Sequence, residues 1–98
     1  MGEVNMHPEY PDREQLDSAE AWLHYADALL AQAEGAGLQR SVQMQQVAMA
    51  LMQAQRHGAD ETTIRRLLLT RATLELADQV QDLGLEDGAI SLRQLAGR

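Results

Sequence analysis

The spacing of apolar residues along the chain predicts four helices, because in each of four segments these residues recur every three or four positions. The first segment covers residues 12–34, and its apolar positions alternate between leucine and alanine, so a neighbouring helix can approach closely. These positions are Leu16, Ala19, Leu23, Ala26, Leu30 and Ala33. Asp12 with Gln15, or Asp17 with Glu20, has the spacing of a capping box, so either pair fits the start of this helix.

The second segment, residues 38–57, is apolar almost all the way round. It has no acidic residue, six glutamines and an arginine near each end, and its other positions are mostly valine, methionine, alanine and leucine. A helix that is apolar on all sides is buried on all sides. We therefore expect this helix to be covered on its second face, either by the last helix or by a second copy of the protein.

The third segment, residues 61–82, has more apolar surface than one neighbouring helix can cover. Asp60 precedes it as the expected N-cap. Ile64, Leu67 and Leu68 face one way early in the segment. A second apolar stripe follows, with spacings of 3, 4, 4 and 3 residues. It consists of Leu69, Ala72, Leu76, Val80 and Leu83.

A fourth, short helix is expected over residues 87–96, after Gly84 has ended the third. The composition also favours helix, since the chain holds fifteen alanines and fifteen leucines but only three aromatic residues. The predicted fold is all-α, a small bundle of three long helices plus a short C-terminal helix, completed by dimerisation. Residues 1–10 lack any period and are expected to form a flexible arm, and residues 11–98 a single helical domain.

The predicted dimer follows from chain length and from excess apolar surface. A chain of 98 residues buries only about 60–65% of the surface that its unfolded form exposes, so its core is thin. The helices over residues 38–57 and 61–82 both carry more apolar surface than their neighbours require. We predict a homodimer in which the first of these helices and part of the second supply the shared core.

The charge of the chain is acidic and concentrated at one end. The net charge is −7, and residues 1–34 carry eight acids and one arginine. Such a chain is repelled by phosphate backbones and anionic lipids, so neither nucleic acid nor membrane is expected as a partner. The N-terminus lacks the stretches of a secretory signal and no apolar run is long enough to span a bilayer, so we expect a cytoplasmic protein. The absence of cysteine excludes disulfides and thiolate chemistry.

Two features are compatible with other functions. Glu20, His24 and Asp27 lie at i, i+4 and i+7 on one helix face, a spacing that suits a divalent metal but equally suits a solvated polar face. Residues 80–90 have the turn glycine of a helix-turn-helix, although the second helix would begin with acids facing DNA phosphates. The alternatives are thus a metal- or small-ligand-binding bundle and a DNA-binding regulator.

The leading hypothesis is a protein-binding function. No nucleophile–base pair, glycine-rich phosphate loop or pair of inward carboxylates is found, so we expect neither an enzyme nor a cofactor. Helices and flexible methionines suit recognition of another protein through an apolar groove. We predict a regulator or adaptor, such as a small antagonist (antiactivator) of a transcription factor or enzyme, or a chaperone. The predicted contact residues are Trp22, Leu23, Leu30, Met44, Met49, Met52 and Leu68.

Overall fold

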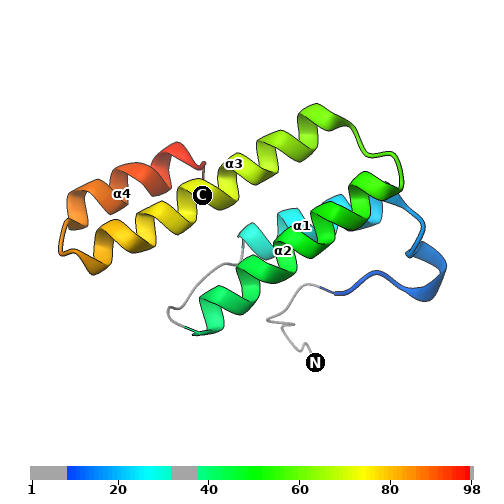
Figure 1. The fold of residues 1–98 in the computed structure, drawn as a ribbon, viewed down its shortest axis with the longest axis horizontal. Coiled ribbons are helices and arrows are strands. Elements are labelled where there is room, and N and C mark those ends of the chain that lie inside the picture. The colour runs from blue at the N-terminus through cyan, green and yellow to red at the C-terminus, as the bar shows by residue number, and fades with distance from the viewer. Residues whose placement is uncertain (1–8, 32–37, 98) are drawn as a thin grey trace, which may run out of the picture.

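Four α-helices make up most of the protein in its computed structural model, which describes residues 9–31 and 38–97 (Figure 1). They are α1 (Ala19–Ala31), α2 (Leu38–Arg56), α3 (Glu61–Asp82) and α4 (Glu86–Leu95), preceded by a short 3-10 helix, η1 (Arg13–Gln15). The described residues contain no strand. The all-α helical bundle predicted from the sequence is confirmed, and its completion by dimerisation stays a prediction.

The first helix is shorter than predicted, because it begins at Ala19 and not at Asp12. The Ser18 hydroxyl oxygen accepts a hydrogen bond from the Ala21 backbone N–H at 3.2 Å, as a helix cap does. The Asp12 backbone N–H donates to Gln15 Oε1 at 3.2 Å, so one bond of the predicted capping box forms at η1 instead. The predicted C-terminal end of this helix lies outside the described residues.

The segment before α1 folds back on the helix through Trp22. The indole Nε1 of Trp22 donates a hydrogen bond to the Leu16 carbonyl oxygen at 2.8 Å. Tyr10 meets the rings of Trp22 and Tyr25 edge-on, with ring centroids 5.2 and 5.4 Å apart. These contacts hold the segment in a turn, which is why the helix starts later than its apolar pattern predicts.

The other helix ends lie within one residue of their predicted positions. The predicted N-cap of α3 is confirmed, since Asp60 Oδ2 accepts a hydrogen bond from the Thr63 backbone N–H at 3.1 Å. Gly58 and Gly84 follow α2 and α3 with φ angles of 88° and 86°, in the left-handed region that favours glycine. Local signals in the sequence therefore placed these ends correctly.

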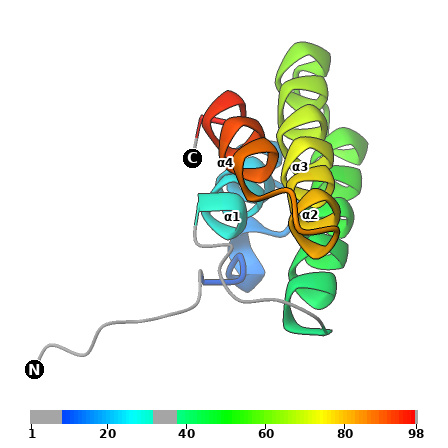
Figure 2. The ribbon, with the colours of Figure 1, turned by 90° about the vertical axis from the view of Figure 1, so that its left-hand side faces the viewer.

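The helices form two antiparallel hairpins, α1–α2 and α3–α4 (Figures 1 and 2). The two helices of each hairpin pack along one another, whereas contact between the hairpins is less extensive and comes mainly from α3 against α2 and α1. Gly88 lets α4 approach α3 closely, because a Cβ atom there would lie 3.1 Å from Cγ1 of Val80. The principal extents of 45 × 38 × 21 Å describe a flat molecule.

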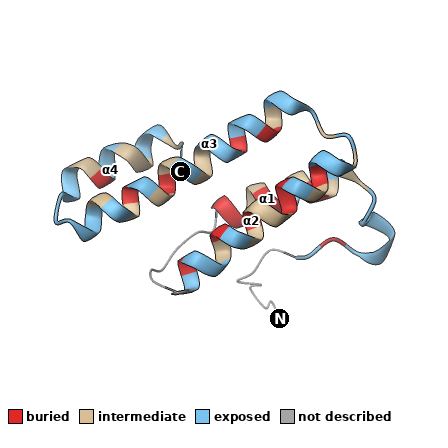
Figure 3. Cartoon of the chain, in the orientation of Figure 1, coloured by how far each residue is buried: buried red, intermediate tan, exposed pale blue. Residues whose placement is uncertain are grey.

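The core lies where α1, α2 and the N-terminal part of α3 meet (Figure 3). Its buried residues include Trp22, Tyr25, Ala26, Leu29, Leu30, Met44, Val47, Ala50, Leu51, Ala54, Ile64, Leu67 and Leu74. The second face of α2 is not covered in the single chain, where Val42 and Met52 are exposed on it. Its cover by a second copy stays a prediction. The face opposite its buried side also holds exposed glutamines, so it is more polar than the apolar pattern predicts.

An ion-pair network joins the two hairpins. Arg40 on α2 is buried, and its Nε and Nη2 donate hydrogen bonds to the carboxylate of Asp78 on α3 at 2.8 and 3.2 Å. Arg93 on α4 donates from Nη2 to the same carboxylate at 3.2 Å. Arg71 Nε of α3 donates to the Met44 carbonyl oxygen of α2 at 3.0 Å. Charged and polar groups therefore supplement the limited apolar contact between the hairpins.

Candidate protein-binding surface

Helix α3 has two apolar faces, and the fold buries only one of them. Leu67 and Leu74 are buried against the rest of the molecule. Leu69 and Leu76 each follow one of these residues by two positions, which turns about 200° around a helix. The second face therefore points away from the core, and Leu69 and Leu76 are 68% and 47% exposed.

We call the uncovered face the α3 stripe and define it as Leu69, Ala72, Leu76 and Leu83. Leu83, at the C-cap of α3, is 76% exposed. Val80, which the sequence placed in the same stripe, is half-buried where α4 approaches. The stripe thus runs the length of the C-terminal two thirds of α3 as a line of large apolar side chains in contact with solvent.

Large apolar side chains are also exposed on the turn after α3 and on α4. We call the whole set the hairpin surface; it comprises Leu68, Leu69, Leu76, Leu83, Leu85, Ile90 and Leu95. The α1–α2 hairpin, by comparison, exposes Val42 and Met52 as its large apolar residues in the described part of the chain. Exposed apolar residues that gather on one element mark an interaction site more often than scattered ones do.

Charge differs between the two ends of the α3 stripe. Arg65 and Arg66 are exposed near its N-terminal end, where Arg65 also pairs with Glu61 one turn away. Asp82 and the first two residues of α4, Glu86 and Asp87, are exposed at the other end. Asp60 and Glu61 are exposed beside the two arginines, so the charges of the N-terminal end cancel, whereas the C-terminal end is acidic.

The predicted contact residues fall into three groups in the structure. Trp22, Leu30 and Met44 are buried in the core of the single chain. Leu23 and Met49 are half-buried against that core.

Met52 and Leu68 are exposed, at 64% and 42%, but they lie on different helices and belong to different surfaces. Leu68 adjoins the α3 stripe, whereas its spacing had predicted that it faces the same way as Ile64 and Leu67, which are buried. The contact residues predicted from the sequence did not include Leu69, Leu76 and Leu83, which are exposed on α3. Their spacing was visible as a second stripe, but the sequence alone did not tell which stripe the fold would cover.

Tyr25 is a buried titratable group within the aromatic cluster. Burial raises the pKa of its hydroxyl above the ordinary value of 10.0, and the nearby Tyr10 adds a smaller increase in the same direction. A tyrosine whose pKa is raised is less acidic and so a poorer nucleophile or base near neutral pH. The edge-on contacts among Tyr10, Trp22 and Tyr25 show that the cluster packs the N-terminal segment against α1.

The polar face of α1 does not form a metal site in the structure. Glu20 and His24 are exposed and Asp27 is half-buried. Across residues 9–31 and 38–97, no group of three or more His, Cys, Asp or Glu side chains is placed to hold a metal ion. The metal-binding alternative consequently gains no support.

Helices α3 and α4 form an antiparallel hairpin and not a helix-turn-helix. Arg93 near the end of α4 reaches back to Asp78 and Gln81 of α3, and Figure 2 shows the two helices side by side. A helix-turn-helix needs its second helix to cross the first steeply, so that the helix can enter a major groove. The DNA-binding alternative gains no support from this geometry.

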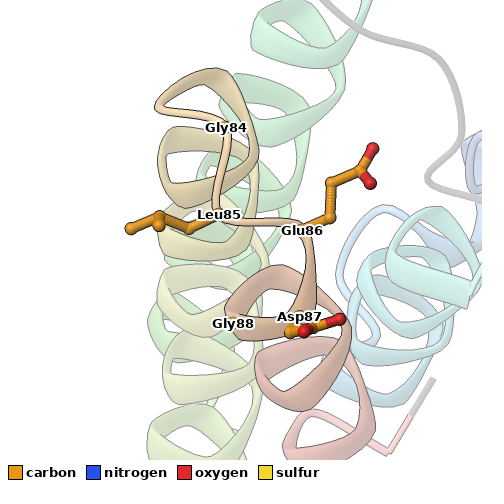
Figure 4. Close-up of a pocket in the computed structure, with 5 residues that line it drawn as sticks. All are labelled: Gly84, Leu85, Glu86, Asp87 and Gly88. Carbon is orange, nitrogen blue, oxygen red and sulfur yellow. The ribbon is translucent and has the colours of Figure 1, made fainter.

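A hollow of about 330 Å³ lies at the α3–α4 turn and is lined by residues 84–88. Figure 4 shows the Leu85 side chain pointing to one side of the hairpin and the carboxylates of Glu86 and Asp87 to the other. Small-molecule sites enclose the ligand and direct several polar groups toward it. This hollow is shallow and its side chains diverge, so it is a poor candidate for a ligand site.

No family model, curated protein or solved structure matches the chain. Function therefore has to be inferred from the surface itself. Among the described residues, no helix combines the length and apolar character that crossing a bilayer requires.

Proposed function

We propose that the protein is a non-enzymatic regulator or adaptor that binds other protein chains through its hairpin surface. The observation that carries the proposal is the second apolar face of α3, which lies opposite the buried face and has three leucines exposed by 47–76%. Exposing these side chains to water is unfavourable, and a docked chain would bury them.

The apolar side chains of α4 extend the surface beyond one helix. Ile90 and Leu95 are 51% and 79% exposed, whereas Ala89 is buried. A surface formed by two packed helices is stiffer than a single helix and can receive a partner helix in the groove between its side chains. We expect the heterologous partner to contact α4 at Ile90 and Leu95.

The test is capture of a partner by tagged protein in an extract of its native host, quantified by mass spectrometry. The wild type is expected to retain a stoichiometric protein partner. The double variant Ile90→Gln/Leu95→Gln removes apolar area without changing charge, and it is expected to lower capture at least about tenfold, a loss of about 1.4 kcal/mol in binding.

A matched control is Val42→Gln/Met52→Gln, which removes two exposed apolar side chains from α2. This variant should capture the partner as the wild type does. If wild type captures no protein in stoichiometric amount, or if the α2 variant loses the partner while the α4 variant keeps it, the proposed function is wrong.

A further inference from the structure

Residues 10–17 lie against α1 as a strap that is attached through side chains. Tyr10 meets the rings of Trp22 and Tyr25 edge-on, and the Leu16 carbonyl oxygen accepts the hydrogen bond from the Trp22 indole. We propose that this strap can leave α1 while the bundle stays folded, and that Trp22 and Tyr25 beneath it form a second binding site. The ligand of this site is a peptide segment in which a tyrosine precedes a proline, and the strap competes with it.

The strap itself buries few groups. Residues 12–17 are exposed, and Tyr10 is 54% exposed even in its edge-on contacts. Backbone hydrogen bonds of 2.8 and 2.9 Å join residues within the range 12–18. Asp17 Oδ1 lies 4.0 Å from His57 Nε2 on the turn after α2, but the Asp17 side chain is 97% exposed, and exposed ion pairs contribute little. Segments with few buried contacts open locally, without unfolding of the whole domain.

The chemistry of the ligand follows from the strap, which occupies the site in the single chain. Pro11 is buried directly after Tyr10, and the next residue, Asp12, has φ −67° and ψ 162°, close to the values of polyproline II. Aromatic surfaces bind segments of this conformation well, because proline presets it and little entropy is lost on binding. The Trp22 indole donates to a backbone carbonyl, an acceptor that every peptide has. A tyrosine–proline peptide can therefore replace the strap.

The aromatic pair is held in place from its other side. Trp22 and Tyr25 belong to the buried cluster that includes residues of α2 and α3, and their ring centroids lie 6.2 Å apart. The bundle therefore keeps both side chains in position when the strap leaves. This site goes beyond the proposed function, because the hairpin surface lies on α3, α4 and the turn between them, so either proposal can fail without the other.

Binding of a separate peptide tests the site. The probe is a fluorescein-labelled peptide of residues 9–17, and fluorescence anisotropy measures its binding to the full chain. Tyr10→Ser/Pro11→Ser frees the aromatic pair. It is expected to bind the probe at least about tenfold more tightly than the wild type, since a minor open state is at most about a tenth of the population. With about 1–10% open and a tethered strap at an effective concentration of about 1 mM, the variant's dissociation constant is on the order of 10–100 µM.

Arg13→Ser/Glu14→Ser is the matched control, because it changes two exposed residues of the same strap without changing the net charge. This control should bind the probe as weakly as the wild type does. A probe that itself carries Tyr10→Ser/Pro11→Ser should not bind the freed chain. Equal binding by the wild type and the Tyr10→Ser/Pro11→Ser chain, or no binding by that chain while it keeps its helical circular dichroism, would overturn the inference.

Hydrogen exchange tests release of the strap in the wild-type chain, without any substitution. Trp22 is the single tryptophan, so its indole N–H gives one identifiable NMR signal, and the hydrogen bond to Leu16 protects this proton while the strap is in place. Its protection factor is expected to be at least about a hundredfold lower than that of the Ala50 amide, which is buried on α2. Equal protection of the two protons would show that the strap leaves only when the bundle unfolds, and the inference would then be wrong.

Discussion

At the scale of single residues, Trp22 and Tyr25 decide how the N-terminal segment meets the bundle. Both side chains are buried, at 2% and 6% exposure, and each is in edge-on contact with Tyr10. Such aromatic pairs add about 0.5–1.5 kcal/mol beyond the burial of their area. The N-terminal segment is thus part of the folded unit from Tyr10 onward, as far as the described residues reach.

Tyr25 makes the stability of the fold sensitive to alkaline pH. Its pKa is raised in the folded chain above 10.0, mainly by burial. Below pH 10 the hydroxyl is protonated in both states, and the stabilisation is fully present. As the pH rises above about 10, the unfolded chain loses the proton first, so unfolding becomes progressively more favourable until the folded-state pKa is passed.

We therefore predict that the free energy of unfolding falls as the pH rises above about 10, and that Tyr25→Phe reduces this fall. Urea unfolding followed by circular dichroism at each pH measures it. The chain has no lysine and no cysteine, so few other side chains titrate in this range. An equal fall in the wild type and in Tyr25→Phe would contradict the assignment.

At the scale of the helix, α3 is the element whose start is most clearly defined by its sequence. Asp60 accepts hydrogen bonds at Oδ2 from the backbone N–H and from the hydroxyl of Thr63, both at 3.1 Å. The cap satisfies an N–H that has no partner within the helix, and its negative charge also lies at the positive end of the helix dipole. Because α3 contacts every other helix, its first turn affects the whole bundle.

Asp60→Ala is expected to lower the free energy of unfolding by about 1 kcal/mol, through loss of this cap. Asp60→Asn is the matched control: it removes the charge but retains an oxygen that can accept the Thr63 N–H, so its effect should be smaller. Urea unfolding at one fixed protein concentration gives both values. Equal losses in the two variants would assign the effect to charge and not to the cap.

At the scale of the whole molecule, two hairpins with limited apolar contact are joined by a network centred on Asp78. Its carboxylate accepts hydrogen bonds from Arg40 on α2 and from Arg93 on α4, so it links three helices. Arg40 is 9% exposed, and a buried guanidinium without a carboxylate partner is costly. The network thus sets the position of the α3–α4 hairpin, and with it that of the hairpin surface.

Asp78→Ala is expected to lower the free energy of unfolding by about 2 kcal/mol, because Arg40 stays buried without its partner. Glu75→Ala is the matched control: Glu75 pairs with Arg71 at 3.4 Å on the same helix, and this more exposed pair should contribute less than about 1 kcal/mol. Urea unfolding at fixed protein concentration compares them. A smaller loss for Asp78→Ala than for Glu75→Ala would show that the network does not join the hairpins.

Which segments are helical, and where most of the helices end, follows from local features of the sequence. The limits of α2, α3 and α4 follow from apolar period, from the cap Asp60 and from Gly58 and Gly84, and all of these act within a few residues of the chain. The segment before Ala19 was misread because its turn depends on the hydrogen bond from Trp22 to the Leu16 carbonyl.

Which apolar residues are covered depends on the packing of distant helices. Leu67 and Leu69 are both leucines on one helix, yet the first is buried and the second is 68% exposed, because α1 and α2 reach just one side of α3. The same choice put Trp22, Leu30 and Met44 in the core and left the α3 stripe uncovered. Helical period is a local property, whereas burial depends on which distant elements happen to be neighbours, so the candidate site became visible only in the folded molecule.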